Sequence, residues 1–253
     1  MISDLQRAMI WKRISAWLLD AILLGILAVG FGFCISWLTG YEGYSEALSR
    51  RYDAMEQKYG VSLSITQQEY EAFSPEKQQA FQAASQALSE DPDAQQAYNM
   101  MISLSLVISS LGILFACLIL EFLVPLGFGN GQTLGKKIFS VGVMSVNGVR
   151  VSRIQMFIRA ILGKYTLEIM LPVLVGTLSF FGSLGIYGTG LIFALGLLQL
   201  ILLFATYNRS LIHDLLSGTV VIDLPSQMIF ETEAEKRSYI ENLESERKAH
   251  PYD

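Results

Sequence analysis

The sequence is poor in charged residues and contains very little histidine or cysteine. Charged residues make up 16% of the 253 residues, whereas hydrophobic residues make up 52%. A typical soluble domain is about 25% charged. The net charge of −5 is not accompanied by a contiguous basic stripe, which argues against nucleic-acid binding. The composition therefore predicts an integral membrane protein and not a soluble enzyme.

The scarcity of metal-binding and catalytic residue types narrows the function further. His213 is one of two histidines and has no second histidine nearby, which argues against a metal site. Cys34 and Cys117 lie in apolar runs expected at opposite membrane faces, so we expect no disulfide. The glycine-rich run over 129–136 lacks the spacing and the preceding strand of a phosphate-binding loop. We expect no catalytic site, no metal and no cofactor.

Four apolar runs are long enough, or nearly so, to cross the ~30 Å hydrocarbon core of a bilayer. They cover residues 18–38, 101–124, 165–181 and 191–205, and the last one extends back to Ile186. The first run follows a basic, aromatic lead, but it is too long for a signal peptide and carries Asp20. We expect Pro172 to kink the third run, and a glycine-rich turn over 182–190 to make the last two runs an antiparallel pair.

Two segments outside the runs have helical signals. Residues 41–99 contain a capping box (Thr66 with Glu69) and two further helix starts at Ser74-Pro75 and Asp91-Pro92. These signals predict a helical insert whose last helix continues into the second span. The tail over 224–253 is acidic from Glu231 onward and is expected to be a solvated helix.

The loop over 127–164 contains six basic residues and no acidic one. Asn147-Gly148 between valines predicts a type I′ hairpin over 141–151, and residues 218–222 predict one more strand beside it. Ser152 begins an amphipathic interfacial helix over 153–163. The expected fold is an all-α integral membrane protein with four transmembrane helices, a small β-sheet, this interfacial helix and the helical extracytoplasmic insert.

Loop charges predict the orientation in the membrane. Because basic loops stay in the cytoplasm, the N-terminus, the 127–164 loop and the C-terminal tail are expected on the cytoplasmic side. The acidic insert then lies outside. An even number of spans is consistent with both termini on one side.

Three carboxylates lie within spans, where a charge costs about 2.5 to 3.5 kcal/mol on insertion scales. With the predicted orientation, Asp20, Glu121 and Glu168 fall at a similar depth in the cytoplasmic half. The candidate partners lie at the same level: Arg13 two turns before Asp20, Lys164 four residues before Glu168, Arg159 on the interfacial helix, and Asp214 after the last span.

The sequence leaves three interpretations of this charge cluster open. The charges can be buried ion pairs that fix the helices in one packing. Two or three of the carboxylates can instead line a cation or proton site. Some of the charges can also be helix-end groups that extend to the interface. A similar depth supports the first two interpretations equally.

At these residues the chain resembles the RDD family of bacterial membrane proteins. The resemblance rests on three blocks in order, namely Arg13 with Asp20, the run over 131–137 followed by the hairpin and Arg159, and Asp214 in the run over 211–221. It covers residues 10–40 and 100–223 and implies that Arg13, Asp20 and Asp214 act as one unit. We hypothesise that Asp214 meets Arg13, which leaves Asp20 to face Glu121 or Glu168.

The resemblance implies a transport role, with exchange of sodium or protons proposed for some members. We therefore expect a transport protein of the bacterial plasma membrane that is cation- or proton-coupled, embedded in the lipid bilayer and acting as a homo-oligomer because four spans are few. The alternative is an accessory, scaffold or regulatory protein that binds a membrane partner through its insert or its basic loop.

Overall fold

The computed structural model describes residues 6–180, 184–206 and 208–249. The chain divides into two compact units. One unit combines Met1–Val29 with Gly112–Asp253, and the other is Gly30–Leu111.

Among the described residues, four helical segments are long and apolar enough to cross a membrane. They are α1 (Ile10–Thr39), the continuous helix α5–η1–α6 (Pro92–Cys117, Leu118–Leu123 and Val124–Phe128), the continuous helix α8–η2–α9 (Arg153–Phe157, Ile158–Met170 and Leu171–Phe180), and α10 (Gly185–Ala205). The four predicted spans are confirmed as helices, and the fourth does extend back past Ile186.

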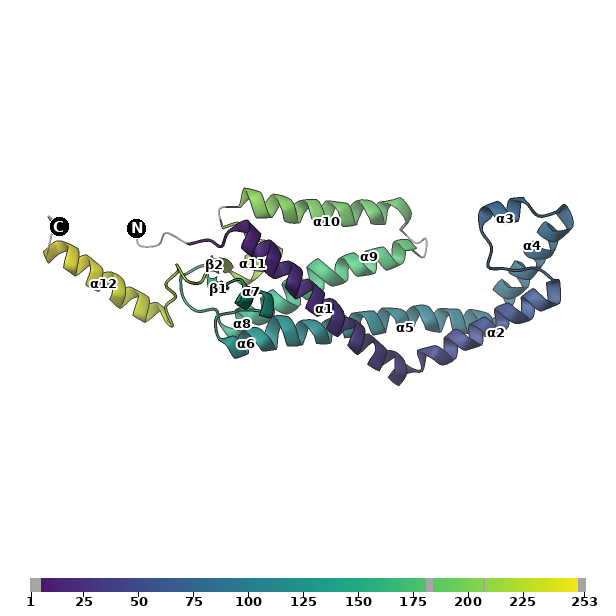
Figure 1. The fold of residues 1–253 in the computed structure, drawn as a ribbon, viewed down its shortest axis with the longest axis horizontal. Helices are drawn as coiled ribbons and strands as arrows, with labels where there is room; N and C mark the ends of the chain where they lie inside the picture. Colours follow the sequence, from purple (N-terminus) through teal and green to yellow (C-terminus); the bar gives the residue numbers. More distant parts are fainter. Residues whose placement is uncertain (1–5, 181–183, 207, 250–253) are drawn as a thin grey trace. The chain divides into compact units, whose positions relative to one another are not determined.

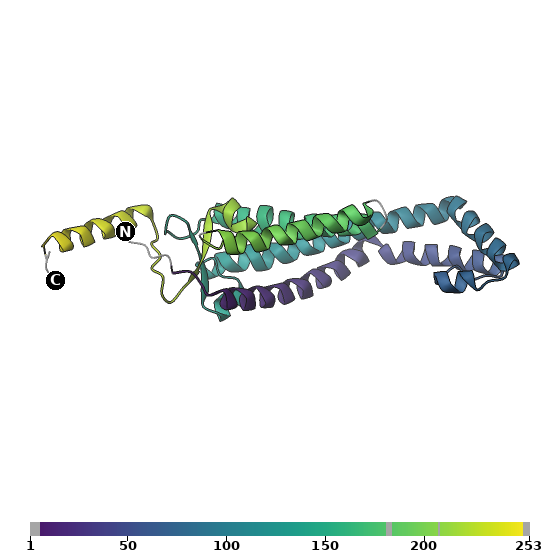
Figure 2. The ribbon, with the colours of Figure 1, turned by 90° about the horizontal axis from the view of Figure 1, so that it is seen from above.

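The last two spans pack against each other as the predicted antiparallel pair. α9 and α10 lie side by side in both views (Figures 1 and 2), and their residues are in contact. The predicted end of the third span at Phe181, and Gly182 of the turn, lie outside the described residues.

Two spans change from α- to π-helix just before a proline. η1 contains Glu121 and precedes Pro125, while η2 contains Glu168 and precedes Pro172. Proline has no N–H, and its ring clashes with the carbonyl four residues earlier, which here belongs to Glu121 or to Glu168. Inserting π-helical turns relieves this conflict without ending the helix. The predicted kink at Pro172 is therefore accompanied by a long π-helical segment.

The π-helical turns also correct one prediction, that of a separate interfacial helix over 153–163. That segment is continuous with the third span. Its Arg159 and the adjoining Lys164 are buried, whereas Arg153 at its start is exposed. Arg159 and Glu168 are nine residues apart, or about 2.5 turns of an α-helix, which would place them on opposite faces. A π-helix has roughly 4.4 residues per turn, so the same nine residues make about two turns and bring both to one face.

A two-stranded antiparallel sheet joins distant parts of the first unit. β1 (Val141–Ser145) pairs with β2 (Thr219–Asp223), with Val143 opposite Val221. β1 and most of β2 are buried. The short helices α7 (Leu134–Ile138) and α11 (Ile212–Ser217) contact β1 and β2 respectively (Figure 1). The predicted strand near the C-terminus is thus confirmed.

The predicted type I′ turn is wrong in its backbone geometry. The N–H of Gly148 donates to Ser145 O over 2.9 Å, so a tight turn is present. A type I′ turn centred on Asn147-Gly148, as predicted, needs positive φ at both of these residues. Among the described residues other than glycine, only Ser140 and Arg209 have positive φ, whereas Gly148 has φ 82°. The observed turn runs from Ser145 to Gly148. Its central residues, Val146 and Asn147, have negative φ, and only Gly148 adopts the left-handed conformation.

The second unit contains the predicted helical insert. It comprises α2 (Tyr41–Tyr59), α3 (Gln67–Glu71), α4 (Pro75–Glu90) and the first part of α5, and α2 packs against α4. The predicted helix starts are confirmed: Thr66 and Glu69 form the capping box, Ser74 caps α4, and the Asp91 side chain accepts from the first turn of α5. The C-terminal tail forms α12 (Glu233–Ala249). Cys34 and Cys117 are free, and no disulfide joins them.

One backbone contact decides how closely α11 approaches η2. A Cβ built on Gly163 would lie 2.6 Å from the Cα of His213 and closer still to its Cβ. Real Cβ atoms do not approach other atoms this closely, so the two elements can pack only because residue 163 is glycine.

We expect Gly163→Ala to lower the stability of the fold by about 1–3 kcal/mol, because the added methyl group overpacks the contact with α11. Thermal unfolding in detergent measures the change. Gly196→Ala is the matched control, since a Cβ at Gly196 meets nothing within 4 Å. Equal unfolding temperatures for the two variants would contradict the close contact.

Candidate functional site

Asp214 is the centre of a buried network of ion pairs in the first unit. Arg159 Nη1 donates to Asp214 Oδ1 and also to Thr219 Oγ1 at 2.7 Å. Arg13 Nη2 lies 3.6 Å from Asp214 Oδ2, and the N–H of Leu211 donates to the same oxygen over 3.1 Å. The predicted proximity of Arg13 and Asp214 is confirmed. One carboxylate thus serves two arginines.

The charges around Asp214 keep it ionised. Burial alone raises the pKa of this carboxyl, but the positive charges of Arg159 and Arg13 outweigh burial and hold its pKa below the ordinary value. Asp214 is 1% exposed and Arg159 is 2% exposed. Because both groups are removed from solvent, neither can lose its partner without a large desolvation penalty.

Asp20 has other partners than the two acids predicted for it. Its Oδ1 accepts the N–H of Gly135 over 2.8 Å, and its Oδ2 accepts the hydroxyl of Thr133. Both donors belong to the start of α7, where Thr133 is the N-cap. A Cβ on Gly135 would collide with the Ala16 carbonyl and lie 2.9 Å from Asp20 Oδ1. Thr133 and Gly135 therefore let α7 dock against α1 at Asp20.

Lys136 is a buried cation that was not among the predicted residues of the charge cluster. Its Nζ donates to Thr133 Oγ1 over 3.3 Å and lies 4.0 Å from Asp20 Oδ2. Burial lowers the pKa of this lysine, the charge of Lys164 lowers it further, and Glu121 partly opposes them, which leaves a pKa of about 8. No helix-end signal distinguishes it, because Lys136 lies in the last turn of the five-residue helix α7, where a positive charge is ordinary.

The other two intramembrane acids also have basic partners. Glu121 Oε1 lies 2.5 Å from Lys164 Nζ. Glu168 lies 2.7 Å from His213 Nδ1 and accepts the backbone N–H of the same residue over 3.2 Å. Instead of the predicted pair of Lys164 with Glu168, Lys164 pairs with Glu121 of η1. Glu168 pairs with His213 of α11.

His213 is a second buried group at this site that was not among the predicted site residues. Burial lowers its pKa, although Asp214 and Glu168 act in the opposite direction. The imidazole is therefore neutral near pH 7. Protonating it would add a positive charge between two carboxylates.

A cavity of about 300 Å³ lies beside this network. Its charged and titratable lining consists of Arg13, Asp20, Lys136, Arg159, Lys164 and His213. Three of the six predicted site residues, namely Arg13, Asp20 and Arg159, line it directly. The other three, Glu121, Glu168 and Asp214, contact side chains in that lining. The structure therefore brings all six predicted residues together around one cavity.

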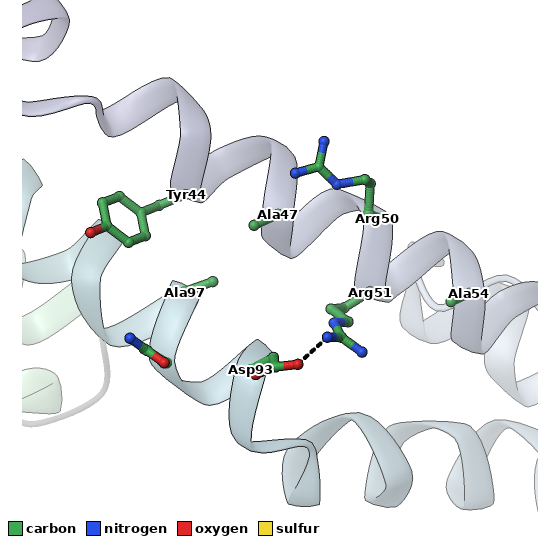
Figure 3. Close-up of a pocket in the computed structure, with 8 residues that line it drawn as sticks. Tyr44, Ala47, Arg50, Arg51, Ala54, Asp93 and Ala97 are labelled. Carbon is green, nitrogen blue, oxygen red and sulfur yellow. Dashed lines mark hydrogen bonds and ion pairs between the residues drawn. The ribbon is translucent and has the colours of Figure 1, made fainter.

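The insert has a separate cavity of about 520 Å³ between α2 and α5 (Figure 3). Tyr44 and Ala47 line it from α2, and Ala97 lines it from α5. Arg51 of α2 pairs with Asp93 of α5 (Figure 3). Its Nη1 also lies 3.5 Å from Asp91 Oδ2. This cavity has a mixed lining of small, aromatic and charged side chains.

Residues 7–218 of the chain match the RDD family. The chain belongs to the RDD family. Comparison with curated proteins and with solved structures gives no match. Together with four apolar helices, membership in the RDD family makes the chain a multi-pass membrane protein. In this RDD protein the three residues Arg13, Asp20 and Asp214 do not form one contact. Arg13 binds Asp214, Asp20 binds α7, and the cavity adjoins both.

We expect Asp214→Asn to destabilise this RDD protein by about 3–5 kcal/mol, because two buried arginines lose their shared counter-charge. Thermal unfolding in detergent at pH 7 measures the loss. Asp223→Asn is the matched control, since Asp223 pairs with the partly exposed Lys12 and an exposed pair contributes about 0.2–1 kcal/mol. Comparable losses in the two variants would contradict the central position of Asp214.

The lowered pKa of Lys136 predicts how the stability of the fold depends on pH. Its pKa is about 8 in the folded protein and 10.5 for an ordinary lysine. Between these values the unfolded chain binds more protons at this site, so stability contributed by residue 136 rises with pH. We expect Lys136→Gln to remove this rise in unfolding temperature from pH 8 to 10. Lys137, the exposed neighbouring residue, provides the control. A Lys137→Gln variant should keep the rise in unfolding temperature with pH.

Proposed function

We propose that the chain is a proton-coupled transport protein of the RDD family and that the cavity beside Asp20 is its substrate site. The observation that carries this proposal is the cavity itself, which is lined by six charged or titratable side chains on or next to membrane-spanning helices. A purely structural set of ion pairs needs no empty space, and unfilled volume in a core costs stability.

The energetics of burial also support a functional network. Buried ion pairs can often be replaced by packed apolar residues with no loss of stability, so stability alone does not require them. Charges within membrane spans are costly and commonly mark the path of an ion or a proton. In this chain Glu121, Lys164 and Arg159 are buried within spans.

The pairing favours coupling to protons over binding of a bare metal cation, the other alternative that the sequence left open. Glu121 and Asp214 each have a basic partner in contact, as does Glu168. A metal cation would have to displace an ammonium, guanidinium or imidazole group. Proton uptake and release need no displacement, because Lys136 and His213 have pKa values shifted toward the neutral range or below it.

The proposal includes an orientation and an assembly. By the positive-inside rule, the end with the basic 127–164 loop is cytoplasmic and the insert lies outside a bacterial plasma membrane. Both termini then lie in the cytoplasm. Four spans give few helices to enclose a transport path, so we propose that the chain works as a homo-oligomer.

The insert supports a second candidate function, that of an accessory protein that binds a membrane partner. The observation in its favour is the compact Gly30–Leu111 unit with its own cavity between α2 and α5 (Figure 3). Transport by itself does not require such a unit.

Proteoliposomes that contain a pH-sensitive dye test the transport proposal. Gradients of sodium, potassium, chloride and phosphate are imposed in turn, and the internal pH is followed. We expect at least one gradient to move protons faster than in protein-free vesicles. We expect Asp20→Asn and Glu121→Gln to abolish this flux, because each removes one charge of the network at or beside the cavity.

Lys137→Gln is the control for the flux assay, because Lys137 is exposed and lies outside the cavity lining. Size-exclusion profiles must match wild type before the fluxes are compared. Absence of proton movement with every gradient in the wild-type chain would contradict transport. If a membrane protein also co-purifies and is lost when residues 44–95 are deleted, the accessory function replaces it.

A further inference from the structure

The charged part of the cavity lining is strongly biased toward positive groups. Arg13, Lys136, Arg159 and Lys164 line the cavity, whereas Asp20 is its single lining carboxylate among the described residues. Of the remaining acids, Glu121 and Asp214 contact these cations and Glu168 contacts His213, and none of the three lines the cavity. A bound group therefore meets mainly guanidinium and ammonium groups.

The positive groups are also incompletely balanced at close range. Arg13 and Arg159 share the one carboxylate of Asp214. Lys136 Nζ lies at the limit of an ion pair, 4.0 Å from Asp20, whose two oxygens already accept from Thr133 and Gly135. An anion placed among these three cations would gain charge-assisted hydrogen bonds, and the planar arginine fork suits a phosphate group particularly well.

The opposite part of the lining is apolar and belongs to the surface that faces lipid. Ile14 and Trp17 of α1 are 42% and 58% exposed, and Leu200 of α10 is 55% exposed. Because these exposed residues also line the cavity, the cavity reaches the outer surface of the spans between α1 and α10. A ligand with a long apolar chain can therefore leave its head group inside while its chain remains in the bilayer.

We propose that the cavity binds a phosphate-bearing lipid, whose head group lies among Arg13, Lys136 and Arg159 and whose chains leave between α1 and α10. This inference rests on the proposed function, because it names the substrate class of the same cavity. The volume of about 300 Å³ is roughly ten times the ~30 Å³ share of one water molecule. It accommodates a phosphate and the first atoms of the attached chains.

The test uses the purified full chain in nanodiscs of phosphatidylcholine that contain a minor fraction of phosphatidic acid. Native mass spectrometry after release from the nanodisc measures which lipid remains bound. We expect wild type to retain phosphatidic acid in preference to phosphatidylcholine. We expect Lys136→Gln to weaken retention about 10-fold or more, the loss associated with one hydrogen bond to a charged group.

Two further variants distinguish a specific lipid site in the cavity from general attraction between basic residues of the protein and anionic lipids. Lys137→Gln removes the same charge one residue away, where the side chain lies over the ring of Phe128 and outside the cavity, so it should retain the lipid as wild type does. Leu203→Trp narrows the cavity without changing its charge and should reduce retention. Equal loss in Lys136→Gln and Lys137→Gln, or full retention in Leu203→Trp, overturns the proposal.

A competition experiment distinguishes the two sources of phosphate. Inorganic phosphate at millimolar concentration should not displace phosphatidic acid, because it cannot use the apolar part of the lining. If inorganic phosphate binds with the same dependence on Lys136 and no lipid is retained, the ligand is a free anion and the lipid assignment is wrong. Proton flux without lipid retention overturns the lipid assignment alone, whereas lipid retention without proton flux in any of the ion gradients overturns the proton coupling and leaves the lipid site standing.

Discussion

Asp214 lies between Arg13 and Arg159 at a site almost closed to solvent, and the first unit is organised around this contact. An ionised carboxylate in such a place requires positive partners, because burial without them would force it to take up a proton. The two arginines come from the first and third spans, while Asp214 follows the fourth. A single carboxylate therefore ties together three of the four membrane-spanning segments, and β2 holds it in place through Thr219 and Arg159.

The π-helical turns determine which side of the third span carries its charged side chains. In η2 they bring Arg159, Lys164 and Glu168 to one side of the third span, where they meet Asp214, Glu121 and His213 respectively. The proline that follows each π-helical segment explains why regular α-helix is interrupted at these points. The same local irregularity thus gives partners to three charges, the buried Arg159 and Lys164 and the half-buried Glu168. Their partners are then fixed, and the cavity beside them is bounded by groups that cannot rotate away without losing an ion pair.

The features predictable from sequence are those set by local chemistry. Apolar length indicated the four spans, and short polar signals indicated the helix starts at Thr66, Ser74 and Asp91. The proximity of Arg13 and Asp214 came from the family resemblance. The partners of Asp20, Lys164 and Glu168 depend on helix periodicity and on contacts between distant elements, which α-helical spacing misrepresents. Lys136 was missed because its burial results from the docking of α7 onto α1, which no local pattern encodes.

The pairing of β1 with β2 has a consequence for biogenesis. The aspartate at 214 and the strand over 219–223 leave the ribosome after all four spans, whereas Arg13 leaves it before the first span is complete. Until synthesis passes this point, the early spans carry basic groups without their final counter-charge. The four spans therefore precede the carboxylate that Arg13 and Arg159 share, and their final packing at this site has to wait until residue 214 emerges.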